Sequence, residues 1–316
     1  MRTNLSEMLG IDHSVIVAPM FLVSNVEMTV AAAEGGATGA IPALNYRTDK
    51  ELRAAIAEIK SRTDKPFGIN LIVNKSNPKY KKQLDTLVEV GVDYIITSLG
   101  SPEETIRRCK PKGIKVFCDV VDEAYAKKVE DLGADAVIAV DNSAGGHCGP
   151  LEKADLIKRL LENCSLPVIS AGGVAKAEHY QEALAMGASG VSVGTVFLAS
   201  EEADLSKEYQ DALIDYGAED VVLTTKLSGS HLTVINTPYV QKIGTEASFF
   251  ESLLLKNKTL KKYVKMFVAF KGMKKIENSM SKASYKSMWC AGPAIEHVHS
   301  VRPLEEILGD ILPKEE

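Results

Sequence analysis

The sequence predicts an α/β protein: a (β/α)8 TIM barrel with a mostly helical insertion after the eighth strand. Three observations support this fold class. Eight short apolar runs alternate with helical patterns, a helix–Gly–strand junction recurs, and the first strand leads into "APMFLVSN" rather than a dinucleotide-binding glycine motif. A doubly wound sheet, the main rival, usually has fewer strands and a G-x-G-x-x-G after the first one.

The eight apolar runs are nearly continuous and often β-branched, as expected of strands buried on both faces of a parallel sheet. They cover residues 15–20, 38–44, 67–73, 93–99, 114–120, 135–141, 167–173 and 189–195. Helical patterns such as "NPKYKKQLDTLVEVG" and "EAYAKKVEDLG" fill the gaps. Each strand is therefore expected to be followed by a helix, the repeating unit of a barrel.

The junctions "AEGGATGAI", "VEVGVDYII", "VEDLGADAV" and "LAMGASGVS" end a helix at a glycine and then enter a strand. Glycine takes the left-handed conformation of a helix end at no cost. The regularity stops near residue 200. We expect residues 1–200 to form the barrel, 201–285 a mostly helical insertion over its mouth, and 286–316 a closing segment with the helix "VRPLEEILGDIL".

The composition excludes several classes of protein. It is 45% hydrophobic and 25% charged, as in ordinary globular proteins, and the net charge of −5 argues against broad nucleic-acid binding. Asp12 and His13 interrupt the N-terminal region, which argues against a signal peptide, and no apolar run reaches the roughly 18 residues of a membrane helix. The five cysteines form no C-x-x-C pair. We therefore expect a cytoplasmic protein without a disulfide framework or structural zinc.

The loops after the seventh and eighth strands predict a phosphate site. Active sites of such barrels lie at the carboxyl ends of the strands, and the last two loops often bind phosphate. "SAGGVA" places Gly172 and Gly173 where backbone N–H groups can face an anion, and "SVGTVF" adds Gly194 and the Thr195 hydroxyl. Tight turns are the alternative for either loop alone. Because the sequence has no P-loop lysine motif, a cofactor monophosphate such as FMN fits better than a nucleoside triphosphate.

The loops after the first and third strands suit the body of a flavin. Pro19 and Met20 offer an apolar, flat-sided contact. Asn70 can both donate to and accept from the pyrimidine edge of the ring, although a simple turn residue is the alternative there.

The stretch "DNSAGGHCGP" places His147 in the sixth loop, facing the same mouth. Gly145 and Gly146 let the backbone approach a ligand closely. A histidine titrates near neutral pH, so His147 can take a proton from a carbon acid. Two alternatives stay open: a metal ligand, with Asp119 and Asp141 on neighbouring strand ends, and a structural histidine. We expect the base role and no metal.

Cys148 is the other reactive group in this loop, but nothing identifies a base that would activate it, so we expect a passive or redox-sensitive thiol. Pro150 is expected at a helix start, where it fixes the exit of the loop. His231, in "LSGSHLT", could border the pocket. The other histidines lie outside the strand-end loops and are expected to be structural or surface residues: His13, His179, His297 and His299.

These residues resemble the nitronate monooxygenase family (formerly 2-nitropropane dioxygenases), which also contains flavin-dependent enoyl-acyl carrier protein reductases. The resemblance runs through "VIVAPM", "PFGINLIV", "SAGGHCG", "PVISAGGVA" and "SVGT", and continues more weakly into "TTKLSGSHLTVIN" and "WCAGPA". It covers nearly the whole chain. The A-G-G-H-x-G motif at residues 144–149 is its most specific element.

The resemblance implies an FMN-dependent oxidoreductase with His147 as the catalytic base. In such a nitronate monooxygenase the histidine removes the α-proton of a nitroalkane, and dioxygen completes the oxidation. In the reductases the corresponding site serves hydride transfer to an enoyl thioester, with NAD(P)H as the donor. A flavin-binding barrel without catalysis is the third hypothesis. The implied FMN contacts are Met20, Asn70, Val140, Gly145, Gly173 and residues 192–195.

Four departures from the family pattern are expected to affect the substrate side. A common Gly-x-Glu-Ala is replaced by "DNSA", Ser192 replaces a common Gln, a Thr-Gly-x-Pro-Ala-Arg-like stretch has become "LSGSHLT", and a late Gly-Gln has become Gly292-Pro293. The expected partners are a small-molecule substrate with dioxygen or NAD(P)H, without nucleic acid or membrane; a homodimer stays open. The full predicted cofactor site is Ala18, Pro19, Met20, Asn70, Val140, Ala144, Gly145, Gly146, Ala171, Gly172, Gly173, Ser192, Val193, Gly194 and Thr195.

Overall fold

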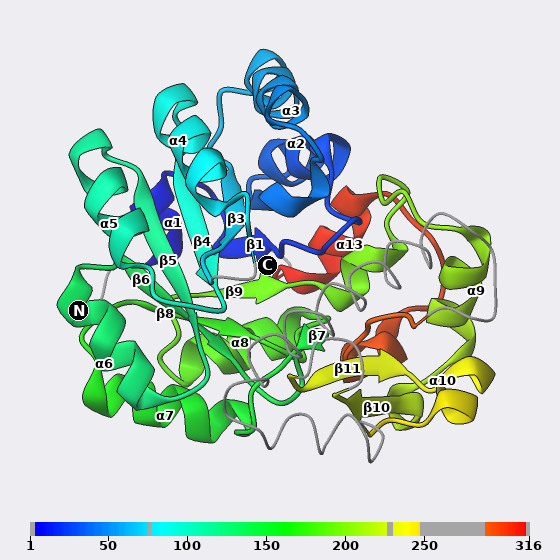
Figure 1. Ribbon diagram of the computed structural model, residues 1–316. Helices are drawn as coiled ribbons and strands as arrows, with labels where there is room; N and C mark the ends of the chain where they lie inside the picture. The colour runs from blue at the N-terminus through cyan, green and yellow to red at the C-terminus, as the bar shows by residue number, and fades with distance from the viewer. Residues whose placement is uncertain (1–3, 75–76, 226–229, 247–287, 314–316) are drawn as a thin grey trace.

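Eight parallel strands close into a barrel in the computed structural model, which describes residues 4–74, 77–225, 230–246 and 288–313 (Figure 1). The order around the barrel is β1-β2-β3-β4-β5-β6-β8-β9. Each barrel strand pairs with the next barrel strand along the chain, and β9 closes on β1. This confirms the predicted (β/α)8 fold class. Every strand lies within one of the eight predicted runs: β1 (Val15–Val17), β2 (Thr38–Pro42), β3 (Gly68–Ile72), β4 (Tyr94–Ser98), β5 (Lys115–Val120), β6 (Ala136–Val140), β8 (Val168–Ala171) and β9 (Gly190–Val193).

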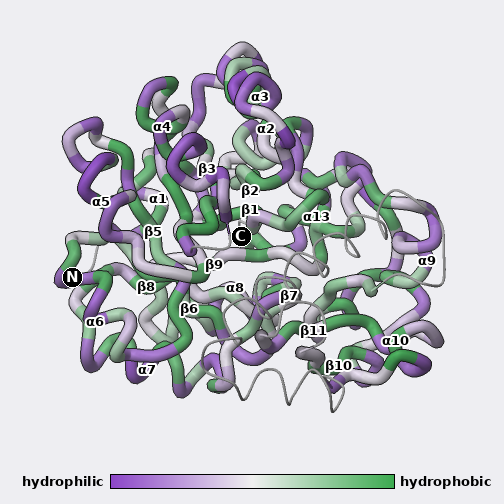
Figure 2. The backbone as a smooth tube through the Cα atoms, viewed as in Figure 1, coloured by the Kyte–Doolittle hydropathy of each residue, from purple (hydrophilic) through white to green (hydrophobic). Residues whose placement is uncertain are grey.

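The barrel strands are surrounded by helices that bury one apolar face each. Figure 2 shows hydrophilic stretches on the outer helices α3 to α6. In α3, a capping box between Thr48 and Glu51 starts the helix, and its buried side includes Leu52, Ile56 and Ile59. The surrounding helices are α2 (Val26–Glu34), α3 (Asp49–Arg62), α4 (Tyr80–Val90), α5 (Glu103–Cys109), α6 (Glu123–Leu132), α7 (Lys153–Asn163), α8 (Ala177–Ala185) and α13 (Leu304–Ile311).

The helix ends follow the predicted glycine junction in part. Gly133 ends α6 in the left-handed conformation (φ 91°, ψ 33°), as expected. Gly35 ends α2 with a negative φ of −74°, and the left-handed φ of 79° falls on Gly36 instead. Helix α7 begins at Lys153, so the expectation that Pro150 stands at a helix start is wrong; Pro150 lies within the loop.

The barrel interior is packed at its amino-terminal end. The aromatic rings of Tyr94 and Phe117 stack with centroids 5.0 Å apart, and Gly68 leaves the space that the Tyr94 ring fills. Helix α1 (Leu5–Leu9) closes this end, because Leu5 joins the interior cluster and its backbone N–H donates to the Ser189 carbonyl. A ligand can therefore enter the barrel only at the carboxyl ends of the strands.

After β9 the chain forms a small antiparallel sheet beside the barrel, in the order β10-β11-β7. Its strands are β10 (Val221–Thr224), β11 (Leu232–Ile235) and the two-residue β7 (Gly146–His147) from the sixth loop. The described part of the expected insertion thus holds two strands beside α9 (Lys207–Asp215) and α10 (Pro238–Ile243). Residues 247–285 lie outside the described residues, so the mostly helical character and the domain boundaries stay predictions. Within the described ranges, no helix has the length and apolarity needed to cross a membrane.

Candidate active site

The strand register places the predicted cofactor residues in one layer at the barrel mouth. Val140 on β6 pairs with Ala171 on β8, and Ala171 pairs with Ser192 on β9. The loop after β1 joins this layer because the Ala18 backbone N–H donates to the Val193 carbonyl at 2.8 Å. The Val193 side chain itself packs into the core outside the strands, so only its backbone can face a ligand.

The loop after β8 is built around two glycines with positive φ. Gly172 has a φ of 139° and Gly173 a φ of 60°. A Cβ on Gly172 would lie 2.0 Å from Asp141 Oδ1, and one on Gly173 would lie 2.8 Å from Ser143 Oγ and 3.4 Å from Lys153 Nζ. Glycine is therefore required at both positions, and the Lys153 ammonium group stands beside the predicted phosphate loop. The sequence analysis missed Lys153, although its place at the first position of the helix after the sixth loop was a usable signal.

The sixth and eighth loops meet the C-terminal segment at a close contact. Thr195 Oγ1 accepts a hydrogen bond from the Gly292 N–H at 3.0 Å. A Cβ on Gly145 would lie 2.7 Å from Thr195 Oγ1 and 3.0 Å from the Gly292 nitrogen. On its other side, the eighth loop faces the first, because a Cβ on Gly194 would lie 3.6 Å from Met20 Sδ. These contacts link four predicted site residues, Met20, Gly145, Gly194 and Thr195, to Gly292. The resemblance had named Gly292 only as part of a departure from the family pattern.

The His147 loop is held by strand β11. His147 pairs with Leu232 and Gly146 pairs with Thr233 in antiparallel register. The Thr233 hydroxyl donates to the Ala144 carbonyl at 2.7 Å and contacts the Gly146 carbonyl at 3.3 Å. The sequence analysis missed this support, for which the alternating run "LTVI" was the available signal.

The His147 side chain is accessible to water, yet the protein around it removes enough solvent to lower its pKa below the usual value of 6.5. The neutral imidazole therefore predominates at neutral pH. The neighbouring Cys148 has a raised pKa because of burial and the nearby Asp141 carboxylate, so its thiol stays protonated. The exposed His231 contributes its carbonyl oxygen, which accepts the Cys148 N–H at 3.5 Å.

Asp141 is buried under the loop after β8, the predicted phosphate loop. Its side chain is 1% exposed, and its Oδ1 accepts from the Ser143 N–H at 2.7 Å and the Ser143 hydroxyl at 2.6 Å. Burial raises the pKa of Asp141. The unusual residues before the histidine motif thus shape the underside of the loop that carries Gly172.

On the opposite side of the mouth, Asn70 belongs to a buried polar chain. Its Nδ2 donates to Ser98 Oγ at 2.7 Å and to the Ile96 carbonyl at 3.2 Å. Ser98 in turn donates to Asp119 Oδ2. Burial raises the pKa of Asp119 to about 6, and the Ser98 hydrogen bond partly opposes this rise. Asn70 therefore lies within strand β3 and not in a turn, and its contact with a cofactor stays a prediction.

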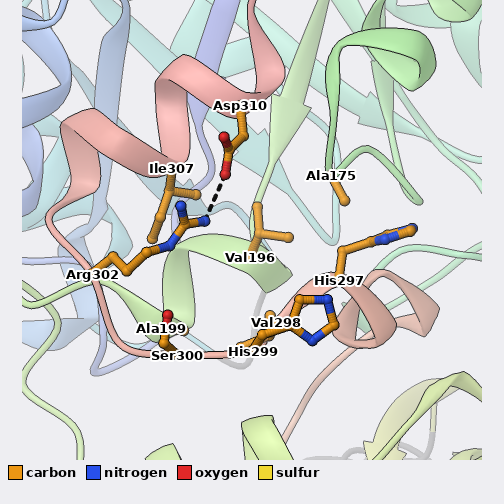
Figure 3. A pocket seen from close by; sticks show the side chains of 10 residues that line it. All are labelled: Ala175, Val196, Ala199, His297, Val298, His299, Ser300, Arg302, Ile307 and Asp310. Atoms are coloured by element: carbon orange, nitrogen blue, oxygen red, sulfur yellow. Dashed lines mark hydrogen bonds and ion pairs between the residues drawn. The ribbon is translucent and has the colours of Figure 1, made fainter.

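A second pocket lies outside the predicted site, between the last helix and the segment that follows the site loops (Figure 3). Arg302 and Asp310 form an ion pair of 2.6 Å in its wall. His297, which also lines it, stands against His179 with ring centroids 5.2 Å apart. None of the predicted cofactor residues lines this pocket, although Ala175 and Val196, which follow the loops after β8 and β9, do. The structural or surface role expected of these histidines stays a prediction.

Comparison with known proteins gives a consistent family assignment. A family model described as nitronate monooxygenase matches residues 2–314. The chain is 32% identical over 243 residues to the Rhodococcus jostii (strain RHA1) enzyme (3aS,4S,5R,7aS)-5-hydroxy-7a-methyl-1-oxo-octahydro-1H-indene-4-carboxyl-CoA dehydrogenase, covering 77% of this chain and 68% of that protein. It is 26% identical over 288 residues to a probable nitronate monooxygenase of Staphylococcus aureus (strain MSSA476), covering 77% and 80% respectively. The structure of FabK from Thermotoga maritima superposes with a TM-score of 0.83 at 27% identity, covering 98% and 95% of the two chains.

Proposed function

The chain belongs to the nitronate monooxygenase family, and from this premise we propose that it is an FMN-dependent enzyme that oxidises nitroalkanes and nitronates with dioxygen, using His147 as its general base. Its membership makes the protein an oxidoreductase, and the names of its relatives agree. The hypothesis of a flavin-binding barrel without catalysis is therefore set aside.

The observation that carries this proposal is the setting of His147. Strand pairing with β11 holds its backbone beside the mouth, and desolvation keeps its imidazole neutral. A base must be unprotonated at the working pH and fixed near the proton that it removes. The lowered pKa of His147 supports the first property. The Thr233 hydrogen bond to the Ala144 carbonyl, which steadies the loop, supports the second.

The residues at the mouth fit a flavin mononucleotide. Gly172 and Gly173 provide a turn that a Cβ would obstruct, and Lys153 adds a cation beside it, so this loop would hold the phosphate together with Thr195. Met20 and the amide of Asn70 would contact the ring. FMN, when bound, supplies electron-transfer chemistry that can be completed by dioxygen or a nicotinamide nucleotide.

The chain's own part in the reaction is proton transfer and orientation. A ring nitrogen of His147 takes the proton from the carbon next to the nitro group, and the electron pair of the broken C–H bond passes into the nitro group as the nitronate forms. The imidazole becomes an imidazolium, whose positive charge favours the anion beside it. A substrate supplied as a preformed nitronate does not need this step.

A second candidate function is reduction of an enoyl thioester, with NAD(P)H as the hydride donor and FMN as the carrier. It is supported by the names of two relatives, the carboxyl-CoA dehydrogenase at 32% identity and FabK at 27% identity over nearly the whole chain. In this chemistry FMN would deliver hydride to the β-carbon of the enoyl thioester, and His147 would supply the proton to the carbon next to the thioester carbonyl.

Anaerobic flavin reduction distinguishes these candidates. The purified protein is loaded with FMN and mixed separately with a nitronate, with NADH and with NADPH, while the flavin absorbance is followed. Reduction by the nitronate alone supports the nitronate function. Rapid reduction by a nicotinamide nucleotide, followed by reoxidation with an enoyl thioester, supports the second candidate. Absence of reduction by any of the three would falsify both.

A further inference from the structure

A hydrogen-bonded chain of side chains crosses the barrel mouth from β3 to β5. Asn70, Ser98 and Asp119 stand on three neighbouring parallel strands and are joined in that order. Asn70 is 7% exposed, and its sequence neighbours Ile69 and Leu71 pack into the core outside the strands. Because strand side chains alternate, Asn70 must point inward.

The donors and acceptors of this chain determine its direction. An ionised Asp119 carries only acceptors, so the Ser98 hydroxyl must donate its proton to it. Ser98 Oγ can then only accept from Asn70, and the Ile96 carbonyl beside it, which is also an acceptor, likewise requires a donor as the nearer atom of the amide. Both requirements are met when Asn70 turns its NH₂ group toward β4. The carbonyl oxygen Oδ1 is then the end of the amide that a ligand meets.

We propose that Asp119 and Ser98 are positioning residues that orient the Asn70 amide so that it accepts a hydrogen bond from an N–H group of the ligand. The ligand class is therefore one with an imide or amide N–H on the edge that faces β3. Under the proposed function, on which this identification rests, that edge is the pyrimidine ring of the flavin. Asn70 does not act there as a donor to a ring carbonyl.

The charge on Asp119 controls the donor-to-acceptor direction of the hydrogen bonds that join Asn70, Ser98 and Asp119. Burial raises its pKa to about 6, whereas the pKa values of the adjacent Cys118 and Tyr125 are raised to about 12, so these two groups stay neutral near pH 7. Of these three groups, Asp119 alone changes charge around pH 6. Once protonated it can donate to Ser98, and Ser98 no longer requires the NH₂ group of Asn70.

The first test measures the FMN dissociation constant of the apoprotein at pH 7.5, by fluorescence titration. Ser98→Ala and Asp119→Asn should each weaken binding about threefold to tenfold, the usual range for one lost hydrogen bond. The double variant should bind FMN no more weakly than the worse-binding single variant, because both substitutions interrupt the same hydrogen-bonded series Asn70–Ser98–Asp119. Ser98→Thr keeps the hydroxyl and should bind as the wild type does. Thr97→Ser, on the outer face of the same strand, is the matched control.

Two results would overturn the proposal. Losses that multiply in the double variant would mean that Asp119 acts on the ligand through its charge and not through Ser98. Unchanged affinity in all variants would mean that the orientation of Asn70 does not matter for binding. Circular dichroism of each variant verifies that it is folded. If Ser98→Ala does not fold, the conservative Ser98→Thr protein and Asp119→Asn still allow the test.

A second measurement separates failure of this inference from failure of the proposed function. If the wild type binds no FMN, the proposed function falls, but the chain can still be tested in the ligand-free protein. An NMR titration of the carboxyl groups, with the Asp119 signal assigned by its loss in Asp119→Asn, should show a higher Asp119 pKa in Ser98→Ala. An unchanged pKa would mean that Ser98 does not donate to Asp119.

Discussion

His147 is the residue on which the proposed chemistry depends, because it combines a lowered pKa with a backbone fixed by β11. We expect His147→Ala to reduce kcat/KM for a neutral nitroalkane by about a hundredfold or more, the usual contribution of a general base. FMN should stay bound, and turnover of a preformed nitronate should change far less. His299→Ala, in the pocket that none of the predicted cofactor residues lines, is the control histidine. Loss of FMN from His147→Ala would instead make His147 a structural residue.

The lowered pKa of His147 also predicts the pH dependence of the reaction. Because the neutral imidazole is the active form, kcat/KM for a neutral nitroalkane should rise with pH through a pKa below 6.5 and be flat at neutral pH. The same profile measured with a preformed nitronate should lack this rise, since no proton is removed. An inflection above 6.5 would contradict the assignment of His147 as the desolvated base.

Gly145 makes a prediction about packing at the residue scale. A methyl group at this position would press on Thr195 Oγ1 and the Gly292 nitrogen, so Gly145→Ala should lower the free energy of unfolding by about 1–3 kcal/mol and weaken FMN binding. The matched control is Gly309→Ala in helix α13, where nothing lies within 4 Å. There, helix propensity should raise stability by about 0.5–1 kcal/mol. Chemical denaturation measures both, and equal effects at the two sites would contradict the close contact.

At the scale of elements, strand β11 holds the His147 loop, to which it does not belong, so under the proposed function it should affect catalysis. Thr233→Val keeps the shape of the side chain but removes the hydroxyl that donates to the Ala144 carbonyl. We expect a lower kcat and nearly unchanged FMN affinity. The Ala144 carbonyl, left without its donor, should lower the free energy of unfolding by about 1–3 kcal/mol. Thr233→Ser should restore the rate. A Thr233→Val enzyme with normal kcat would mean that β11 covers the loop without positioning it.

The elements of the barrel could be predicted because each one has a local signal. Strands buried on both faces are continuous apolar runs, and all eight fell within the predicted ranges. Strand β7 has no such signal, since it is only Gly146 and His147 and exists because β11, far along the chain, pairs with it. Its discovery required the tertiary structure.

The site residues divide along the same line. Candidates on strand-end loops, such as Gly173 and Thr195, could be proposed from the sequence because the barrel rule brings all these loops to one end. Lys153 and Asp119 acquire a role only through contacts across loops or strands, beside Gly173 and Ser98 respectively. Such contacts depend on register and loop geometry, which a single sequence does not reveal.

At the scale of the whole molecule, the proposed function assigns recognition of the cofactor to two halves of the mouth. The loops after β8 and β9 carry the positive-φ glycines and Lys153, whereas β3 carries the polar chain of Asn70. A ligand that spans both halves should stabilise the closed barrel more than one that fills only one half. Under the proposed function FMN is expected to contact both halves, whereas riboflavin, which lacks the phosphate, is expected to contact only the half around β3.

Thermal unfolding tests this division of roles. At about one hundred times its dissociation constant, FMN should add about 2.7 kcal/mol to the free energy of unfolding and raise Tm by several degrees. At the same concentration riboflavin should raise Tm by less, because the glycine loops and Lys153 then have no phosphate to bind. Lys153→Met should reduce the difference between the two ligands by lowering the response to FMN and leaving that to riboflavin. Equal shifts with FMN and riboflavin in the wild type would mean that the loops after β8 and β9 do not bind the phosphate.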